Sequence, residues 1–384
     1  MLVVPASVCP TQQRGVAPGG AGGAIIWCGW WLYRFFSLTL QCQSYHIMFK
    51  KLLTALLPVL AAMSMQAQSD STFSYKPQLD GVIRLRAELD TETGDSRLAV
   101  RNARLSVRGN VCAPVTYFLQ ADFCDQGKFI FLDAYLQGAL GRGWSLRGGQ
   151  FRVPFGRDVF RIPGRYIFVN RSFIARDILN MRAVGAQGAF KPAGLPLTFT
   201  AGAFSPEAIG AHKSWTNQYT LAAKAALDSG HWHAEISAAS AAPDSVRFNL
   251  FDAAVTYTVG ALTLEGEYAL KHYTHHRFNT CHAYNVWASY DIPTRLKWFK
   301  QWSWQARMDG TTAHSTATRA ADGYIKEDQP RRNRLTIGTT LVAPLPRNTR
   351  LAIHLNYEKY FYPTGYTAAE TRRDAICAEV VALF

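Results

Sequence analysis

Apolar and polar residues alternate with a period of two through most of the chain after residue 80. In the first such segment, Ile83 and Leu85 alternate with Arg84 and Arg86, so one face is apolar and the other is charged. An amphipathic helix would repeat its apolar residues every three to four positions, and no such repeat is sustained here. The pattern predicts about sixteen antiparallel strands. The segments are 81–89, 102–108, 115–123, 130–137, 144–147, 184–190, 197–204, 219–227, 232–238, 251–258, 262–270, 283–290, 302–308, 335–341, 351–357 and 376–384.

Short links between these segments alternate with mostly longer connections. The longer set comprises 154–181, 205–218, 272–280, 309–331 and 359–372, preceded on the same side by the shorter 91–96 and 124–128. Short turns at one end and long loops at the other are typical of bacterial outer-membrane barrels. Because about sixteen tilted strands enclose a water-filled lumen, the interior should be polar.

A soluble β-sandwich is the rival interpretation, since its strands also alternate. Consecutive hairpins without Greek-key crossovers disfavour it. The chain also ends on a strand whose last residue is Phe384, with Val380 and Ala382 on the same face, which resembles the C-terminal signal of outer-membrane barrels. We therefore predict an all-β fold, a transmembrane antiparallel up-and-down β-barrel whose third external loop folds inward.

The N-terminal segment predicts export. Residues 48–67 combine a basic start, the apolar run 52–62 and a small residue at Ala67, which is the pattern of a secretory signal peptide. Because such a signal works at an N-terminus, we expect residues 1–47 to be a misassigned extension, with a signal anchor as the alternative. Residues 68–384 then form a single barrel domain, with a constriction loop at about 154–181.

The charge balance limits the possible partners. Removing residues 1–67 takes away Arg14, Arg34, Lys50 and Lys51, which leaves 37 basic residues against 27 acids, about +10. A basic exported protein without a DNA-binding motif indicates anionic solutes or anionic lipid as partners, not nucleic acid. No cofactor is expected. The cysteines after residue 67 show neither zinc spacing nor a disulfide framework; they are Cys112, Cys124, Cys281 and Cys377.

The segment 147–182 carries the candidate chemistry. It is rich in arginine, has no lysine, and contains only Asp158 and Asp177 as acids. It is also too apolar for a disordered segment, so we expect an ordered loop that folds into the lumen and presents guanidinium groups to anions. The candidate pore and anion-binding residues are Arg147, Arg152, Arg157, Arg161, Arg165, Arg171 and Arg176, with Arg84, Arg104 and Arg108 from the first strands. About half should be structural, paired with Asp158, Asp177, Asp133 or Asp122, since buried charges need partners.

Three other features have simpler readings. Arg101 falls on the apolar side of its strand by the local alternation, where it could snorkel to an interface. The histidines around His272 and His276, with Cys281, are expected to be solvated rather than to bind metal. A barrel hydrolase would need a serine–histidine pair, and no motif supports Ser237 with His233 or Ser303 with His314.

Four segments resemble the phosphate-selective porin O and P family. They are 100–109 (VRNARLSVRG), 118–123 (FLQADF), 133–136 (DAYL) and 149–156 (GQFRVPFG), all in the first third of the chain after residue 67. The resemblance implies a sixteen-stranded outer-membrane barrel, commonly trimeric, whose third external loop narrows the pore. It also implies a passive diffusion channel for anions, with phosphate or polyphosphate as the expected solute and no enzymatic activity. The family's binding-site lysines have no counterpart that we could place, so a general non-selective porin is the alternative, followed by a barrel hydrolase.

Overall fold

The computed structural model describes residues 74–384 except 126, 179, 207–216, 346–348, 367 and 369–371. The expected extension 1–47 and signal peptide 48–67 lie outside the described residues. None of the helical segments in the described part of the chain is long and apolar enough to cross a membrane.

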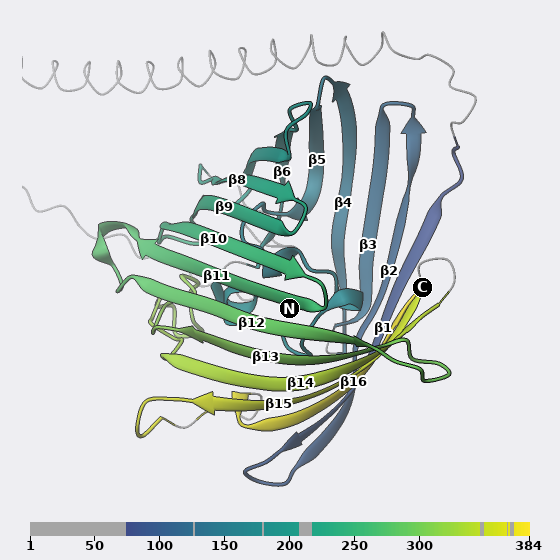
Figure 1. Ribbon diagram of the computed structural model, residues 1–384. Coiled ribbons are helices and arrows are strands. Elements are labelled where there is room, and N and C mark those ends of the chain that lie inside the picture. The colour runs from purple at the N-terminus through teal and green to yellow at the C-terminus, as the bar shows by residue number, and fades with distance from the viewer. Residues whose placement is uncertain are drawn as a thin grey trace, which may run out of the picture. The chain divides into compact units, whose positions relative to one another are not determined.

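Sixteen strands close into one barrel, in which every strand pairs antiparallel with its neighbours in the chain and β1 pairs with β16 (Figure 1). Each segment predicted from the alternation falls on one of these strands, so the predicted fold is confirmed. The strands are β1 (Gln78–Asp90), β2 (Ser96–Cys112), β3 (Val115–Asp125), β4 (Lys128–Gly141), β5 (Trp144–Arg152), β6 (Arg182–Phe190), β7 (Leu197–Phe204), β8 (Thr220–Ser229), β9 (Trp232–Ala241), β10 (Phe248–Val259), β11 (Leu262–Tyr273), β12 (Cys281–Pro293), β13 (Gln301–Thr311), β14 (Arg332–Pro344), β15 (Arg350–Phe361) and β16 (Ala375–Leu383).

The barrel is apolar outside and charged inside. On β9, Ile236 is 64% exposed whereas its chain neighbour Glu235 is only 4% exposed, and the same contrast recurs around the barrel. Closure satisfies the hydrogen bonds of every strand, as a hydrocarbon environment requires. This inside-out distribution is what a lipid-embedded wall around a polar lumen demands.

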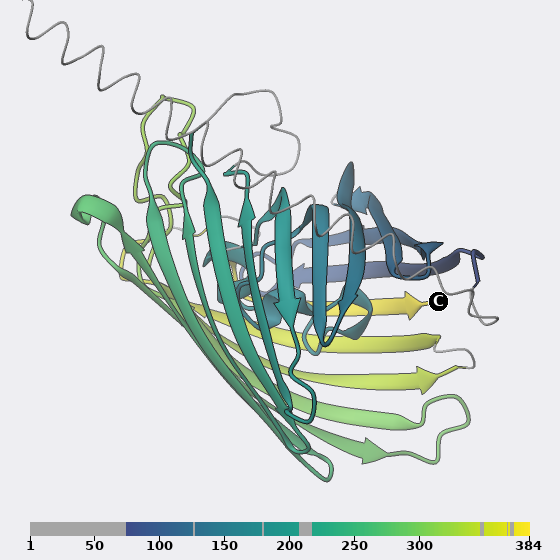
Figure 2. The ribbon, with the colours of Figure 1, turned by 90° about the horizontal axis from the view of Figure 1, so that it is seen from above.

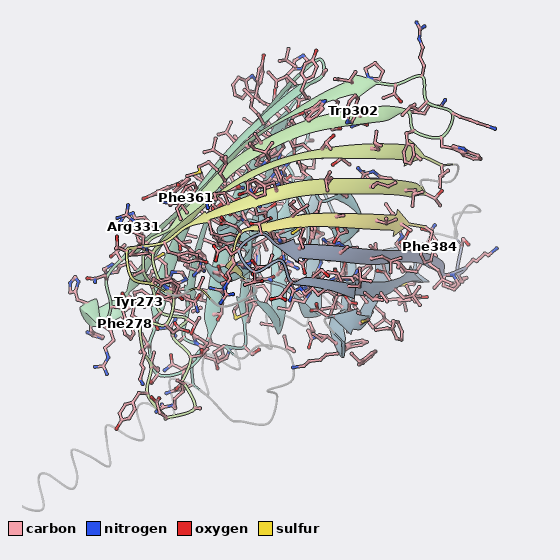
Figure 3. The ribbon with its side chains drawn as sticks, turned by 90° about the horizontal axis from the view of Figure 1, so that it is seen from below. Tyr273, Phe278, Trp302, Arg331, Phe361 and Phe384 are labelled. Atoms are coloured by element: carbon pink, nitrogen blue, oxygen red, sulfur yellow. The ribbon has the colours of Figure 1, made fainter. Side chains whose placement is uncertain are left out.

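Aromatic residues mark both ends of the wall. Trp302 and Phe384 lie toward the end with the short turns, whereas Phe361 lies toward the opposite end (Figure 3). All three are more than one-third exposed on the outer surface. Their positions fit the aromatic girdles that flank the apolar band of outer-membrane barrels.

Arg101 requires a correction. On β1, Arg84 pairs with Asn102 but the next residue pairs with Val100, so Arg101 is the extra residue of a β-bulge. The bulge changes the phase of β2, and Arg101 forms an ion pair with Asp125 on β3 rather than snorkelling from a regular apolar position.

The connection between β5 and β6, residues 153–181, is called the inward loop below. Its short helical turns lie within the ring of strands (Figure 2). Phe155 and Ile174 are fully buried there against Phe204, Leu250 and Tyr273 of the wall. This connection is the third external loop, and its apolar side chains explain why it folds inward, as the sequence predicted.

Candidate pore constriction

The first half of the inward loop is held by the β9–β11 wall. Gly156, at φ 74°, turns the chain in a conformation that favours glycine. Its N–H then donates to Ser237 Oγ at 3.0 Å. The next two N–H groups, from Arg157 and Asp158, donate to Glu267 Oε1 at 2.7 and 3.3 Å. The buried carboxyl group of Glu267, which accepts these two backbone N–H groups, fixes this part of the loop.

Two loop arginines neutralise acids of the same wall. Arg161 binds Asp158 at 2.7 Å and Glu265 at 2.5 Å. Arg157 lies 3.9 Å from Glu235 and 3.7 Å from Glu265. Both were predicted to bind anions, and the structure places both in ion pairs with buried carboxylates.

Asp158 joins the two halves of the loop. It accepts hydrogen bonds from the N–H and hydroxyl of Ser172 at 3.0 and 2.8 Å. Burial opposes its ionisation, but the charges of Arg161 and Arg171 and the Ser172 bonds outweigh burial and hold the pKa of Asp158 well below its usual value. The carboxylate therefore stays ionised and keeps the loop closed on itself.

We expect Asp158→Asn to loosen the loop and raise open-channel current noise. Because the folded pKa is depressed, the stabilisation by Asp158 is fully present above the unfolded value of about 3.9 and is lost only as the pH falls through the folded pKa. The difference in single-channel noise between wild type and Asp158→Asn should therefore persist from pH 7 down to about pH 3.9 and shrink only at lower pH. A wild type as noisy as the variant at pH 7 would contradict this role.

The second half of the loop is held by β1. Arg84 and Arg86 each donate to the carbonyl oxygen of Val169, at 2.8 and 2.9 Å, and Arg86 also donates to Asn170 Oδ1 at 2.9 Å. Both arginines pair with Glu379 of β16. Arg84, a predicted anion-binding residue, is almost wholly buried and serves as an anchor.

Two arginines that the sequence reasoning missed complete this anchor. Arg307 of β13 donates to the Asn170 carbonyl at 2.8 Å, and Arg334 of β14 donates to the Arg171 carbonyl at 2.7 Å. Arg334 also pairs with Asp309 at 2.8 Å. The signal that could have indicated them is their place at inward positions of β13 and β14, outside the arginine-rich segment 147–182.

Four guanidinium groups gather where the loop approaches the β2–β6 side of the wall, and we call them the basic cluster: Arg104, Arg152, Arg171 and Arg182. Arg152 and Arg182 are directly paired on β5 and β6. The charge of Arg171 also acts on Arg152, and the charge of Arg182 acts on Arg104. Arg171 lies over the ring of Tyr166 at 5.7 Å. The fold thus brings three predicted anion-binding residues, Arg104, Arg152 and Arg171, together with Arg182, the first residue of β6.

Acids balance only half of the basic cluster. Arg104 pairs with Asp122 at 3.1 Å and Arg182 with Asp133 at 2.9 Å. Arg152 donates to the Asn180 side chain at 2.6 Å, and Arg171 donates to backbone carbonyl groups. Within the described ranges, neither Arg152 nor Arg171 forms an ion pair with a carboxylate. The cluster therefore keeps an excess of positive charge.

The remaining predicted arginines lie apart from the basic cluster. Arg147 donates to Gln137 at 2.7 Å and lies over aromatic rings of its own wall. Arg108 is exposed and faces Asp80, while Arg176 pairs with Asp177. The last of them, Arg165, lines a separate cavity, which is described below.

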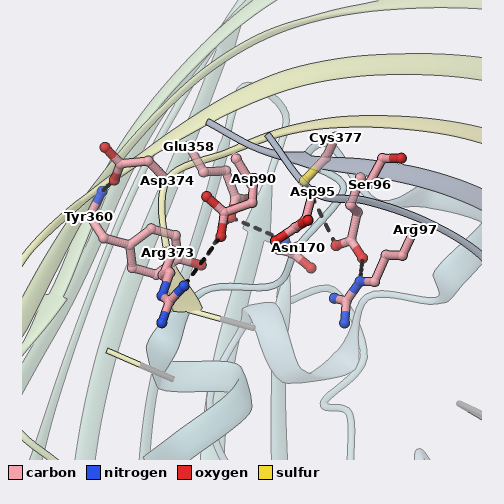
Figure 4. A pocket seen from close by; sticks show the side chains of 12 residues that line it. Asp90, Asp95, Ser96, Arg97, Asn170, Glu358, Tyr360, Arg373, Asp374 and Cys377 are labelled. Atoms are coloured by element: carbon pink, nitrogen blue, oxygen red, sulfur yellow. Dashed lines mark hydrogen bonds and ion pairs between the residues drawn. The ribbon is translucent and has the colours of Figure 1, made fainter. Parts of the chain in front are cut away.

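A smaller pocket of about 270 Å³ opens at the end of the barrel that carries the long loops (Figure 4). Its acids are offset by nearby bases: Arg97 binds Glu88 at 2.5 Å, and Arg373 lies 3.9 Å from Asp90. The sequence reasoning did not anticipate these acids. Because these acids have basic partners, the pocket carries no large excess of negative charge.

The alternative chemistries find little support in the geometry. In the part of the chain that the structure describes, no three His, Cys, Asp or Glu side chains are grouped to hold a metal ion. His233 pairs with Asp228 and Glu235, whereas Ser237 bonds to the loop and to Asp252. The hydrogen bonds of the described residues therefore do not join the serine and histidine that a hydrolase would use.

Comparison with known proteins agrees with the architecture. A family model described as "Phosphate-selective porin O and P" matches residues 78–260, which span β1 to β10. A comparison with curated proteins finds no match.

Solved structures with the same fold include porins and other outer-membrane proteins. An anion-selective porin from Comamonas acidovorans is 14% identical, with TM-score 0.54 over 80% of this chain and 98% of that one. The channel DcaP of Acinetobacter baumannii is 12% identical, with TM-score 0.54 over 80% and 97%. A loop-deletion mutant of OmpT from Vibrio cholerae is 10% identical, with TM-score 0.55 over 80% and 98%. At these identities the likeness concerns the fold. The family model thus confirms the resemblance to the phosphate-selective porin O and P family over residues 78–260, and the solved structures show that the chain has a porin barrel fold.

Proposed function

We propose that this porin is a passive diffusion channel that favours anions, phosphate among them. The observation that carries the proposal is the basic cluster, in which Arg152 and Arg171 form no ion pair with a carboxylate in the described chain. Rings of arginine and lysine in a pore select for anions and phosphate. The planar guanidinium group matches phosphate oxygens in two-pronged geometry and is more weakly hydrated than an ammonium group.

A general porin is the competing proposal, and one observation favours it. Arg157 and Arg161 are matched by Asp158, Glu235 and Glu265, so much of the arginine-rich loop is electrically balanced. If the basic cluster were screened in the same way, the channel would discriminate weakly between ions. The two proposals therefore differ in one measurable quantity, the ratio of anion to cation permeability.

Reversal potential in a salt gradient measures that ratio directly. We expect purified wild-type channels in a planar bilayer to favour chloride over potassium, and to keep conducting when phosphate replaces chloride. Arg152→Gln should reduce the preference, because it removes a guanidinium without leaving an unpaired acid. Arg295→Gln, which removes one charge from the short turn 294–300, is the matched control. An unselective or cation-selective wild type would refute the anion proposal.

We also infer that the barrels assemble as homotrimers in the outer membrane, with their apolar outer faces against lipid. The support is the family resemblance and a Vibrio cholerae OmpT structure, described as a trimer form, with TM-score 0.52 and 11% identity. Light scattering of the detergent-solubilised protein gives the mass of the assembly. A monomeric mass that persists after extraction in mild detergent would contradict this inference.

A further inference from the structure

A cavity with both polar and apolar lining lies between the inward loop and the β11–β15 wall, on the side of the short turns. Its volume is about 500 Å³. The loop contributes Arg165, Tyr166 and Ile167, and the wall contributes inward positions of five neighbouring strands. Cavities of a few hundred Å³ with convergent polar groups are typical small-molecule sites.

Two guanidinium groups stand together in this cavity. Arg165 is exposed to it, and its charge acts on Arg350 of β15. Arg350 donates one N–H to the Gly164 carbonyl at 2.7 Å. Within the described part of the chain neither arginine forms an ion pair, although Asp291 is the one acid among the lining residues. Two neighbouring guanidinium groups with N–H donors left over are suited to binding the oxygens of a phosphate group.

The opposite side of the cavity is a wall of neutral polar groups. Ser303, Gln305, Thr340 and His354 occupy inward positions on β13–β15 and are each less than one-tenth exposed. The Thr340 hydroxyl donates to Gln305 Oε1 at 3.0 Å and lies 2.9 Å from His354 Nδ1. No hydrogen bond from the Gln305 amide nitrogen is found among the described residues, so this donor is available to a solute.

Inorganic phosphate would use only the arginine side of such a cavity. The neutral wall offers donors and acceptors for hydroxyl groups, and Trp287 and Tyr166 add ring surfaces between the two sides. A solute that carries both a phosphate and several hydroxyl groups would engage all of these features at once.

We propose that this cavity is a binding subsite for hydroxylated organic phosphates of the sugar-phosphate class. The inference rests on the proposed anion channel and adds a preference for the organic part of the solute. Arg165 and Arg350 bind the phosphate, and the Gln305–Thr340 wall binds the hydroxyl groups.

Block of the chloride current tests the subsite. Glucose 6-phosphate, inorganic phosphate or glucose is added on the short-turn side of single channels. We expect half-block by glucose 6-phosphate at a concentration about tenfold lower than by inorganic phosphate, since two or three further hydrogen bonds contribute about that factor. Glucose should block weakly, because it lacks the phosphate.

Variants separate the two sides of the subsite. Gln305→Met, or Ser303→Ala if the first fails to fold, should remove the advantage of glucose 6-phosphate over inorganic phosphate. Arg350→Gln should weaken block by both anions, and Arg295→Gln should weaken neither.

Different results would overturn the subsite and the anion channel. Equal block by glucose 6-phosphate and phosphate in an anion-selective wild type would overturn the subsite and leave the channel proposal standing. Equal block by glucose and glucose 6-phosphate would overturn it as well. A wild type without anion preference would overturn the proposed function itself.

Discussion

Replacing Arg334 by methionine is expected to release the second half of the inward loop. The side chain is fully buried and binds Asp309 at 2.8 Å, Glu358 at 3.1 Å and the Arg171 carbonyl at 2.7 Å. Its removal leaves two buried carboxylates short of a partner, and breaking a buried ion pair in this way costs about 3–5 kcal/mol. Both the free energy of unfolding and the position of the loop should therefore change.

Two measurements report these effects. The free energy of unfolding, from urea titration in detergent or lipid, should fall by about 3–5 kcal/mol. Single-channel conductance should rise and become noisy, because the loop no longer holds one position in the lumen. Conductance and stability equal to wild type would contradict the anchoring role.

A second substitution isolates the cause. Because most of the cost arises from unpaired charge, Arg334→Met combined with Asp309→Asn should recover part of the lost stability. It should not restore quiet conductance, since the bond to the Arg171 carbonyl is still absent. The pair of variants thus separates charge burial from loop anchoring.

The strands could be predicted from the sequence because lipid and lumen impose opposite demands on adjacent residues. Where both act, the alternation is clear, as at Ile236 and Glu235. Beyond the hydrocarbon layer both faces of a strand contact water, so the alternation of apolar and polar residues is no longer required and disappears from the sequence. This explains why β2 was predicted at 102–108 but runs from Ser96 to Cys112, with a bulge at Arg101 inside it.

The site was harder to predict because ion pairs depend on register across the barrel. The sequence indicated that the loop would fold inward, but not which arginines would find acids. Besides Asp158 of its own loop, Arg161 pairs with Glu265 on β11, and Arg84 pairs with Glu379 on β16. From the sequence alone, without the closed barrel, nothing distinguishes Arg161, which pairs with acids, from Arg152, which pairs with none in the described chain.

Charge reversal at Arg152 is expected to produce the largest change in selectivity. Arg152 has no carboxylate partner within the described ranges, so its charge contributes to the excess of the basic cluster. A glutamate at this position would face Arg171 and Arg182 and cancel part of their field. A unit charge about 5 Å from a permeating ion in water contributes about 0.8 kcal/mol, so reversal changes the balance by about 1.7 kcal/mol. The ratio of anion to cation permeability should fall by more than about tenfold.

The controls for this prediction follow from the geometry. Arg152→Lys keeps the charge and should keep the preference for anions, although it loses the guanidinium hydrogen bond to Asn180. Arg295→Glu changes the net charge by the same amount at the short turn 294–300 and should shift the reversal potential far less, since salt screens charges beyond about 8 Å. If Arg152→Glu and Arg295→Glu shifted the reversal potential equally, selectivity would arise from the overall charge of the barrel and not from the basic cluster.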